Sequence, residues 1–252
     1  FRLNDLMKTD SLSPALSSPF ASYDDFAAQL QRACVISDPW VEGQERFQLE
    51  PIILEHSRYQ ALTTAAESVG ALYDELCELV WSAPNLLDEF FHLTPYQKLM
   101  WLSSGGRWHG IARLDVFVCA NGGIQICEMN SDTPSGEAEA VTLNEFLRPK
   151  AVQQQPYDPN EGFALRFTDM LWEFYRASVA KPTERPRVGI IYPTEMTEDL
   201  SMIVLYRRWL EQAGFEVIEG SPFNIHPMPG RRAGMFGLHL DIALRHYKTD
   251  WW

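Results

Sequence analysis

Four polar residues stand at alternate positions on either side of Asn121-Gly122-Gly123. Arg113 and Asp115 come before this tripeptide, Glu128 and Asn130 come after it, and apolar, β-favouring residues surround both pairs. Asp, Glu and Asn carry the hard oxygen ligands that Mg²⁺ prefers, and protein-bound Mg²⁺ usually joins one or two carboxylates to substrate phosphates. These residue types predict a cation site, provided that the chain brings them together.

A β-hairpin over residues 113–130 would bring the four residues together, because Asn-Gly between alternating hydrophobic residues is the strongest short-range hairpin signal. A two-residue turn at Asn121-Gly122 sets Ala120 opposite Gly123. Counting outward from this turn then pairs Phe117 with Ile126, Asp115 with Glu128, and Arg113 with Asn130. A turn at Gly122-Gly123 would instead set Asp115 opposite Asn130.

Both turns keep the four polar side chains on one face, because side chains alternate along a strand with a period of two. Only a three-residue loop without a compensating bulge would separate them. Two carboxylates that face each other across a strand pair destabilise it unless a positive charge lies between them. The opposed Asp115 and Glu128 therefore strengthen the prediction of a bound cation.

The residues after the hairpin form a second candidate group. Asp132-Thr-Pro-Ser-Gly136 predicts a tight turn, and Ser135 is a suitable N-cap for the helix that should follow. Free N–H groups at a helix N-terminus attract anions, which makes Thr133 and Ser135 candidates for substrate contact, together with the neighbouring Ser131 and Asp132. The alternative is that Thr133 and Ser135 only cap and turn the chain.

Residues 103–110, Ser-Ser-Gly-Gly-Arg-Trp-His-Gly, form a loop by composition. Its glycines could cradle a phosphate, but no P-loop or dinucleotide fingerprint is present, so a plain connector is the favoured interpretation. We expect His109 to be an exposed loop residue and not a metal ligand, because no second histidine stands at ligand spacing.

Helical spacing of apolar residues on both sides of the hairpin indicates the elements that position it. Residues 51–81 predict a long amphipathic helix with candidate breaks near Ser57 and Gly70, and residues 86–91 predict a short one. A third helix should begin at Thr94-Pro95, with Thr94 as N-cap. Similar spacing predicts further helices over residues 23–34 and 163–180.

The last third of the chain carries the pattern of a β-α-β unit. Residues 187–192 predict a strand, residues 198–213 a helix that Gly214 ends, and residues 215–218 a second strand. This order indicates a parallel, Rossmann-like sheet. No Gly-x-Gly-x-x-Gly follows its first strand, so nucleotide binding by this unit is not indicated. Residues 227–234 predict a loop, and residues 238–247 a further strand.

Size and charge limit the classes of function. The 252 residues are 46% apolar and 22% charged, as in ordinary globular proteins, and the net charge of −13 argues against a nucleic-acid partner. No window approaches the roughly 20 apolar residues of a membrane span, and the N-terminus lacks the order of a signal peptide, so we expect a cytoplasmic protein without a membrane partner. Four cysteines without Cys-x-x-Cys spacing are expected to be reduced and mostly buried: Cys34, Cys77, Cys119 and Cys127.

The sequence Arg113-Leu-Asp115, followed by Glu128-Met-Asn130-Ser-Asp-Thr-Pro-Ser, resembles the circularly permuted ATP-grasp proteins related to glutathionylspermidine synthase. In that family, an Arg-x-Asp strand and a Glu-x-Asn-x-Asp-Thr-Pro strand form the magnesium and phosphate end of the site. Residues 188–192 and the terminal Tyr-Lys-Thr-Asp-Trp-Trp resemble the pre-ATP-grasp domain, in the order expected of the permuted family. The resemblance implies that Asp115, Glu128 and Asn130 bind Mg²⁺, and that Arg113 steadies the transferred phosphoryl group or acyl phosphate.

The activity implied by the resemblance is that of a ligase that uses ATP and Mg²⁺ to join a small-molecule carboxylate to an amine. The implied fold class is α/β (α+β), with an ATP-grasp-type antiparallel sheet and helices plus a Rossmann-like pre-ATP-grasp domain. We expect an N-terminal arm and helix over residues 1–50, the helices and metal-site hairpin over residues 51–182, and the pre-ATP-grasp domain over residues 183–252. The nucleotide clamp of the family is expected beyond Trp252, which makes the chain a fragment.

Three other interpretations stay open. The protein could be a catalytically inactive binding or scaffold protein that retains the fold. It could be a hydrolase with Asp115 and Glu128 as acid and base, which ranks lowest because directly opposed carboxylates would lie closer than the roughly 5 Å or more of glycosidase pairs. The hairpin face could also be a solvated surface on which Arg113 pairs with Asp115.

Overall fold

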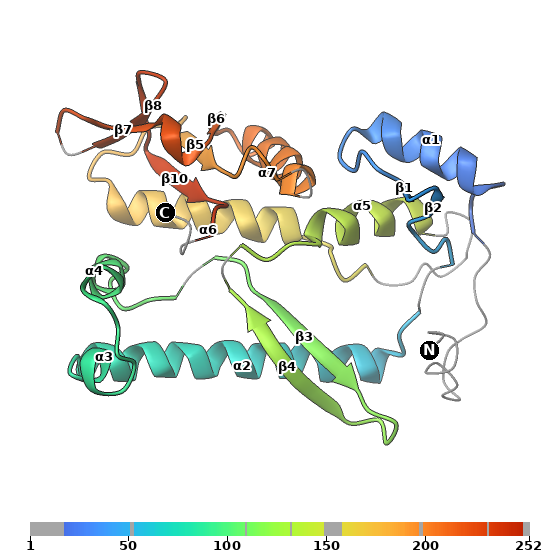
Figure 1. Cartoon of the computed structure of the whole chain (residues 1–252), viewed down its shortest axis with the longest axis horizontal. Coiled ribbons are helices and arrows are strands. Elements are labelled where there is room, and N and C mark those ends of the chain that lie inside the picture. The colour runs from blue at the N-terminus through green and yellow to red at the C-terminus, as the bar shows by residue number, and fades with distance from the viewer. Residues whose placement is uncertain are drawn as a thin grey trace. The chain divides into compact units, whose positions relative to one another are not determined.

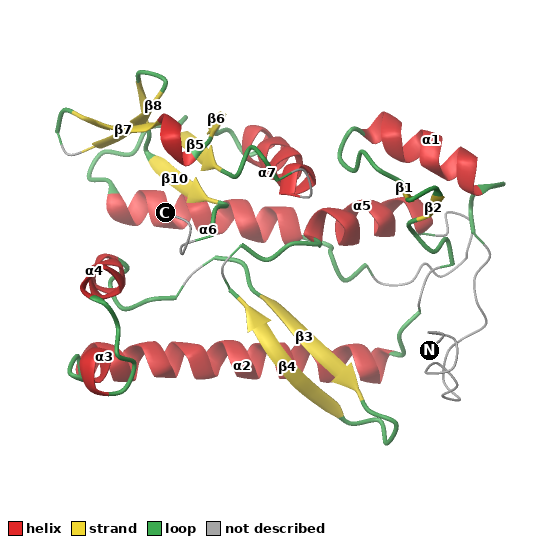
Figure 2. Ribbon diagram, in the orientation of Figure 1, coloured by secondary structure: helices red, strands yellow, loops and turns green. Residues whose placement is uncertain are grey.

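The chain has two main features (Figures 1 and 2). One is a long helix with a β-hairpin beside it, and the other is a small parallel sheet with helices around it. The computed structural model describes residues 18–50, 53–108, 110–131, 133–148, 158–196, 199–230 and 232–248. They form a mixed α/β structure with small antiparallel and parallel sheets. Two compact units divide the chain: the described residues of the first are 54–131, and those of the second are 18–53 and 133–248, with the gaps stated.

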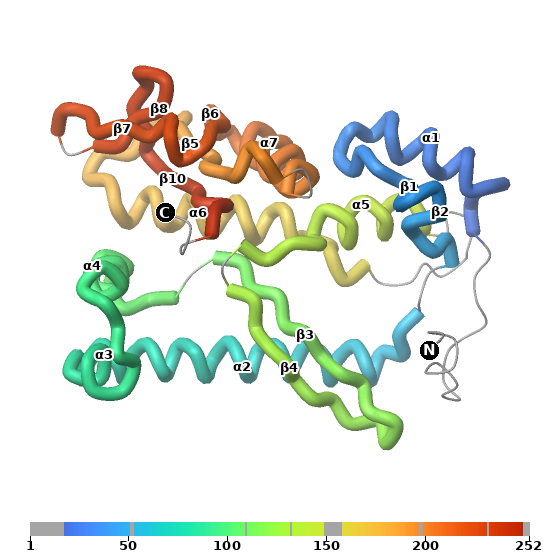
Figure 3. Tube along the Cα trace, in the orientation of Figure 1, coloured from blue at the N-terminus to red at the C-terminus, as the bar shows by residue number. Residues whose placement is uncertain are grey.

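The described residues of the first unit form three helices and the hairpin. The helices are α2 (His56–Ser82), α3 (Leu86–Glu89) and α4 (Pro95–Ser103), and the hairpin strands are β3 (Arg113–Val118) and β4 (Ile124–Asn130). The hairpin crosses α2, and β4 packs against this helix (Figure 3). The helix α2 therefore supports the strand that carries two of the four predicted site residues.

The helices of the first unit follow the sequence prediction closely. The helix α2 continues through Gly70 without a break, so the candidate break there is wrong. Thr94 caps α4 as predicted: its hydroxyl accepts a hydrogen bond from the Gln97 amide at 3.3 Å, and the Gln97 side chain accepts one from the Thr94 amide at 2.9 Å. Pro95 occupies the first turn, where its missing N–H costs no helical hydrogen bond.

The second unit begins with α1 (Tyr23–Ala33), β1 (Trp40–Val41) and β2 (Gln44–Glu45), and resumes with α5 (Glu137–Leu147) and α6 (Phe163–Ser178). The helix α1 confirms the prediction for residues 23–34, because Phe26 and Leu30 are fully buried on one side of it. The described residues between 133 and 182 belong to this unit.

The parallel sheet of the second unit confirms the predicted β-α-β pattern. Strand β5 (Arg187–Ile191) leads through α7 (Leu200–Gln212) to β6 (Glu216–Gly220), and the strand order is β10-β5-β6 with parallel pairing throughout. Gly214 follows α7 with a φ of +92°, the left-handed conformation that glycine adopts freely at a helix end. Helices α5 and α6 both pack against α7.

The region after β6 differs from the sequence prediction. The predicted loop at 227–234 lies largely within β7 (Ile225–Met228) and β8 (Arg232–Met235), which pair antiparallel. The predicted strand at 238–247 is two strands, because β9 (Leu238–His239) joins β8 whereas β10 (Ile242–Arg245) joins β5. Asp241 separates them: its carboxylate accepts a hydrogen bond from the Arg187 amide at 2.8 Å, and its own amide donates to the Arg187 carbonyl at 2.9 Å.

The membrane prediction concerns helix length and polarity. In the residues that the structure describes, no helix combines the length and the apolar character needed to span a bilayer.

Candidate functional site

The hairpin brings the four predicted residues together in two facing pairs. Arg113 lies opposite Asn130 and Asp115 lies opposite Glu128, with antiparallel pairing between β3 and β4. This end of the register is the one predicted from a two-residue turn at Asn121-Gly122.

The turn itself differs from the prediction. Cys119 donates its amide to the Gly123 carbonyl at 2.8 Å, and its own carbonyl accepts the Gly122 amide at 2.8 Å, so residues 120–122 form a three-residue loop. Gly122 has a φ of +80°, the left-handed position that this loop type requires. In consequence Phe117 pairs with Gln125 and not with Ile126.

A β-bulge restores the predicted pairing farther from the turn. The register shifts between Asp115 and Val116, because Val116 pairs with Ile126 whereas Asp115 pairs with Glu128. Cys127 is therefore the extra residue on β4. A bulge inserts one residue into one strand and can re-aim side chains near functional sites, and here it compensates for the odd loop length.

Two side-chain pairs fill the polar face. The Arg113 Nε donates to Asp115 Oδ1 at 2.9 Å and its Nη2 donates to Asp115 Oδ2 at 3.4 Å. On the facing strand, Asn130 Nδ2 donates to Glu128 Oε1 at 3.0 Å. The Arg113 and Asp115 side chains are 42% and 40% exposed, so ligands and solvent can reach them.

The electrostatics favour an ionised Asp115. The hydrogen bond from Arg113 is the main cause that lowers the pKa of Asp115 below its usual value; desolvation opposes it, and the charge of Arg113 and contacts with Glu128 and Asn130 lower it further. Arg113 thus supplies the positive charge that an opposed carboxylate pair needs. The solvated-surface interpretation predicted the Arg113–Asp115 pair, and the structure contains it.

The donor set suits a hard cation that also binds a ligand. Two carboxylates and one amide offer oxygen atoms, and Mg²⁺ commonly takes one or two carboxylates while phosphate oxygens and water complete its shell. Within the described part of the chain, no group of three or more His, Cys, Asp or Glu residues is arranged to hold a metal ion. Phosphate oxygens and water would complete the shell of a cation held by Asp115, Glu128 and Asn130.

The second candidate group is divided between the units. Ser131 ends the first unit and is exposed, Thr133 and Ser135 belong to the second unit, and Asp132 lies outside the described residues. The prediction that Ser135 is the N-cap of α5 is wrong. The N-cap is Gly136, which has a φ of +101° and makes no side-chain hydrogen bond. Thr133 has a φ of +54°, which is rare for a β-branched residue.

The glycine-rich loop after α4 has a structural explanation. A Cβ atom added to Gly106 would meet the Trp81 ring at 2.6 Å, so this glycine lets the loop pack closely on the end of α2. Gly105 and Gly106 both have positive φ, at +68° and +72°. These observations support the plain connector, and His109 lies outside the described residues.

Sequence reasoning missed one pair of charged residues at a cavity of the second unit. Arg46 and Glu139 form an ion pair with 3.0 Å between Nη2 and Oε1, although 93 positions separate them in the chain. No spacing rule relates residues at such a distance, so only the fold could reveal the pair.

No model of a known protein family matches the sequence, and a search of curated proteins finds no match to it.

Proposed function

We propose that the protein is an ATP-dependent carboxylate-amine ligase of the ATP-grasp type, or a part of one. In this reaction ATP and Mg²⁺ activate a carboxylate as an acyl phosphate, and an amine attacks it to form an amide. The observation that carries the proposal is the register of the hairpin, which sets Asp115 opposite Glu128 and Arg113 opposite Asn130 even though the turn has an odd number of residues.

The four residues would divide the work as their chemistry suggests. Asp115, Glu128 and Asn130 would hold Mg²⁺, which would neutralise charge on the bound phosphates. Arg113 stays protonated and binds oxygens as a planar fork, so it suits the phosphoryl group that spreads its charge during transfer. Its present fork to Asp115 keeps the guanidinium on the face where a phosphate would arrive.

The fold of the second unit is compatible with the proposal. Its parallel β10-β5-β6 sheet, in which α7 connects β5 to β6, supports the proposal of a Rossmann-like pre-ATP-grasp domain. Ser131, Asp132, Thr133 and Ser135 follow the hairpin in the sequence and are proposed to contact the small-molecule carboxylate and amine.

The test is Mg²⁺-dependent ATP binding by the full-length gene product, measured by isothermal titration calorimetry with and without Mg²⁺. Glu128→Gln removes a charge without changing the shape of the side chain, and Asn130→Ala removes the amide oxygen. We expect each to weaken Mg²⁺-dependent ATP binding by about tenfold or more, the effect of losing a charged or ligating hydrogen-bond partner.

The matched control is Gln125→Ala, an exposed residue on the same strand beyond the bulge, which should leave binding unchanged. If Glu128→Gln and Asn130→Ala bind ATP as the wild type does, the site assignment is wrong. ATP binding without consumption of ATP in the presence of carboxylates and amines would instead favour the inactive binding or scaffold protein.

A further inference from the structure

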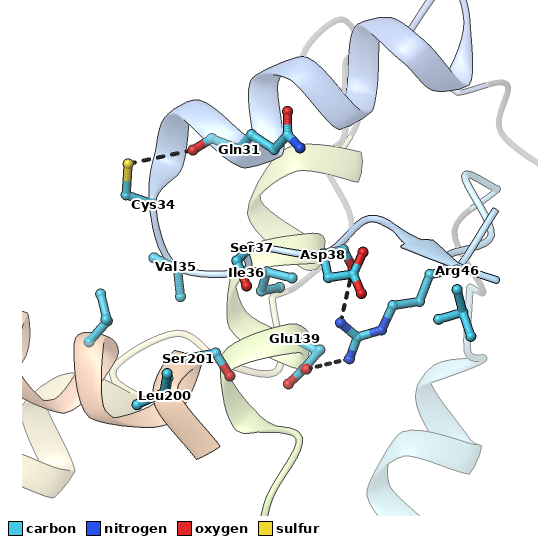
Figure 4. A pocket seen from close by; sticks show the side chains of 12 residues that line it. Gln31, Cys34, Val35, Ile36, Ser37, Asp38, Arg46, Glu139, Leu200 and Ser201 are labelled. Carbon is cyan, nitrogen blue, oxygen red and sulfur yellow. Dashed lines mark hydrogen bonds and ion pairs between the residues drawn. The ribbon is translucent and has the colours of Figure 1, made fainter. Parts of the chain in front are cut away.

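A cavity of about 650 Å³ lies in the second unit, between the end of α1, the β1–β2 segment and the first turns of α5 and α7 (Figure 4). Its volume falls within the roughly 300–1,000 Å³ of small-molecule pockets. All the residues that line it belong to the second unit, whereas the hairpin belongs to the first. Its lining includes Val35, Asp38, Val41, Arg46, Glu139 and Leu200.

One part of the lining is aliphatic. Val35 is 8% exposed, and Val41 of β1 together with Leu200 and Val204 of α7 also line the cavity. Such a wall favours an apolar group, because removing apolar surface from water stabilises a complex.

The other part is polar and contains a fixed guanidinium group. Arg46 Nη1 donates to the Asp38 carbonyl at 3.1 Å, its Nη2 donates to Glu139 Oε1 at 3.0 Å, and the group lies over the Phe47 ring at 4.7 Å from its centre. These three contacts hold it, and a guanidinium has five N–H donors in all. Donors that are already oriented bind a carboxylate with little further loss of side-chain freedom.

The charges around Arg46 limit the kind of ligand. The Glu139 carboxylate contacts the guanidinium, and Asp38 also lines the cavity, so a simple anion would meet repulsion there. A simple cation would meet Arg46. A molecule that carries both charges on neighbouring groups can satisfy both residues, because the Arg46 guanidinium and the Glu139 carboxylate lie side by side, with 3.0 Å between Nη2 and Oε1.

We propose that this cavity binds a free α-amino acid with an aliphatic side chain. Its carboxylate contacts Arg46, its ammonium contacts Glu139, and its side chain packs against the valine and leucine wall. This binding needs neither ATP nor Mg²⁺ and is independent of the ligase proposal.

The first experiment titrates L-leucine into the full chain by isothermal titration calorimetry, without ATP or Mg²⁺. We expect saturable binding. Two probes separate the charges: 4-methylpentanoate lacks the ammonium and 3-methylbutylamine lacks the carboxylate. Each should bind about tenfold or more weakly than leucine, because it leaves one charged group of the cavity without its partner. Equal binding of either probe, or no saturable binding of leucine, overturns the proposal.

The second experiment uses variants. Arg46→Lys keeps the charge and loses the fork, so leucine should bind about tenfold more weakly. Arg32→Lys makes the same chemical change at an exposed position on α1 and is the control. Val41 is 51% exposed, so Val41→Trp should fold normally while its ring fills the mouth of the cavity and abolishes binding. Leucine binding that survives both Arg46→Lys and Val41→Trp undiminished places the ligand elsewhere and overturns the assignment.

Discussion

Asp115 and Glu128 face each other across the β3–β4 ladder, and a β-bulge at Cys127 is what keeps them opposite. Without the extra residue, the three-residue loop would set Asp115 opposite Cys127. The bulge therefore serves the polar face of the hairpin: it keeps the two carboxylates together beside Arg113, where a cation and a phosphate could meet them.

Arg113→Met should raise the pKa of Asp115 toward the usual value of about 3.9. The variant removes the hydrogen bond and the positive charge that lower this pKa, while the facing Glu128 stays in place. The measurement is an NMR titration of the Asp115 side-chain carboxyl carbon. Arg107→Met, at an exposed loop position, is the control. An Asp115 pKa that stays low in Arg113→Met would show that Arg113 is not the cause.

The same pKa gives a direction for stability against pH. A carboxyl group whose pKa is lower in the folded than in the unfolded state stabilises the fold above its unfolded pKa, and this contribution is lost as pH falls through the lowered value. The free energy of unfolding of the wild type should therefore fall more steeply below about pH 4 than that of Arg113→Met. Urea unfolding at a series of acid pH values measures the two slopes, and parallel curves would contradict the prediction.

Arg207→Met should destabilise the protein at neutral pH by about 1 kcal/mol, a value kept small because the arginine is partly exposed. Arg207 Nη2 lies 2.6 Å from Glu219 Oε2, and the Glu219 side chain is only 17% exposed. Burial raises the pKa of Glu219 while Arg207 opposes that rise. Without Arg207, the carboxylate at β6 loses its partner.

The destabilisation caused by Arg207→Met should become smaller as the pH is lowered. A carboxyl group with a raised folded pKa destabilises the fold as pH rises through that value, and Arg207→Met raises the Glu219 pKa further. Below both pKa values Glu219 is protonated in wild type and variant, and the difference in unfolding free energy should largely vanish. Urea unfolding at pH 7 and near pH 4 tests this, with Lys181→Met as an exposed control. A loss that is equal at both pH values would mean that the effect is not electrostatic.

The cysteines should differ in reactivity. Cys34 and Cys127 are exposed, Cys119 is half-buried and Cys77 is buried, which corrects the expectation that most of them are buried. Burial also raises the pKa of Cys77, so less of it is thiolate, the reactive form. A thiol reagent at pH 8 followed by peptide mass spectrometry should label Cys34 and Cys127 first and Cys77 last. Labelling in urea gives the reference rate for each cysteine. Labelling of all four cysteines at one rate in the native protein would contradict the burial of Cys77.

The hairpin shows what local sequence can and cannot predict. Asn121-Gly122 between alternating apolar residues is a strong signal for the turn, so the two strands and their polar face could be predicted. The loop length could not, because Gly122 and Gly123 both tolerate positive φ and allow several turns. The bulge at Cys127 leaves no mark in the sequence pattern, and the correct pairing of Asp115 resulted from two deviations that cancel.

Longer-range relations were harder to predict. Residues 238–247 alternate like one strand, but Asp241 bonds to the backbone of Arg187 and sends the two halves to different sheets. Arg46 and Glu139 meet only because separate segments fold into one unit. Local patterns carry no information about such partners, since the contact is fixed by tertiary packing.

Gly189→Ala should destabilise the second unit by about 1–3 kcal/mol, the cost of overpacking a core. Gly189 lies in the central strand β5, where an added Cβ would meet Leu240 Cδ1 at 2.6 Å and Cδ2 at 3.0 Å. Leu240 is 7% exposed and packs with Ile191 and Met235, so it has little room to move. Thermal and urea unfolding measure the loss.

A double-mutant cycle tests whether the close approach of Leu240 causes the destabilisation by Gly189→Ala. Leu240→Ala alone should cost about 2–5 kcal/mol because it leaves a cavity, but in Gly189→Ala/Leu240→Ala the new methyl group enters the vacated space. The double variant should therefore be more stable than the sum of the single losses by about 1 kcal/mol or more. Gly70→Ala is the contrast: the position is helical, its nearest neighbour would lie 3.9 Å away, and alanine should stabilise α2 by about 0.5–1 kcal/mol. Strict additivity of Gly189→Ala and Leu240→Ala would show that Gly189 is needed for its backbone and not for the close approach of Leu240.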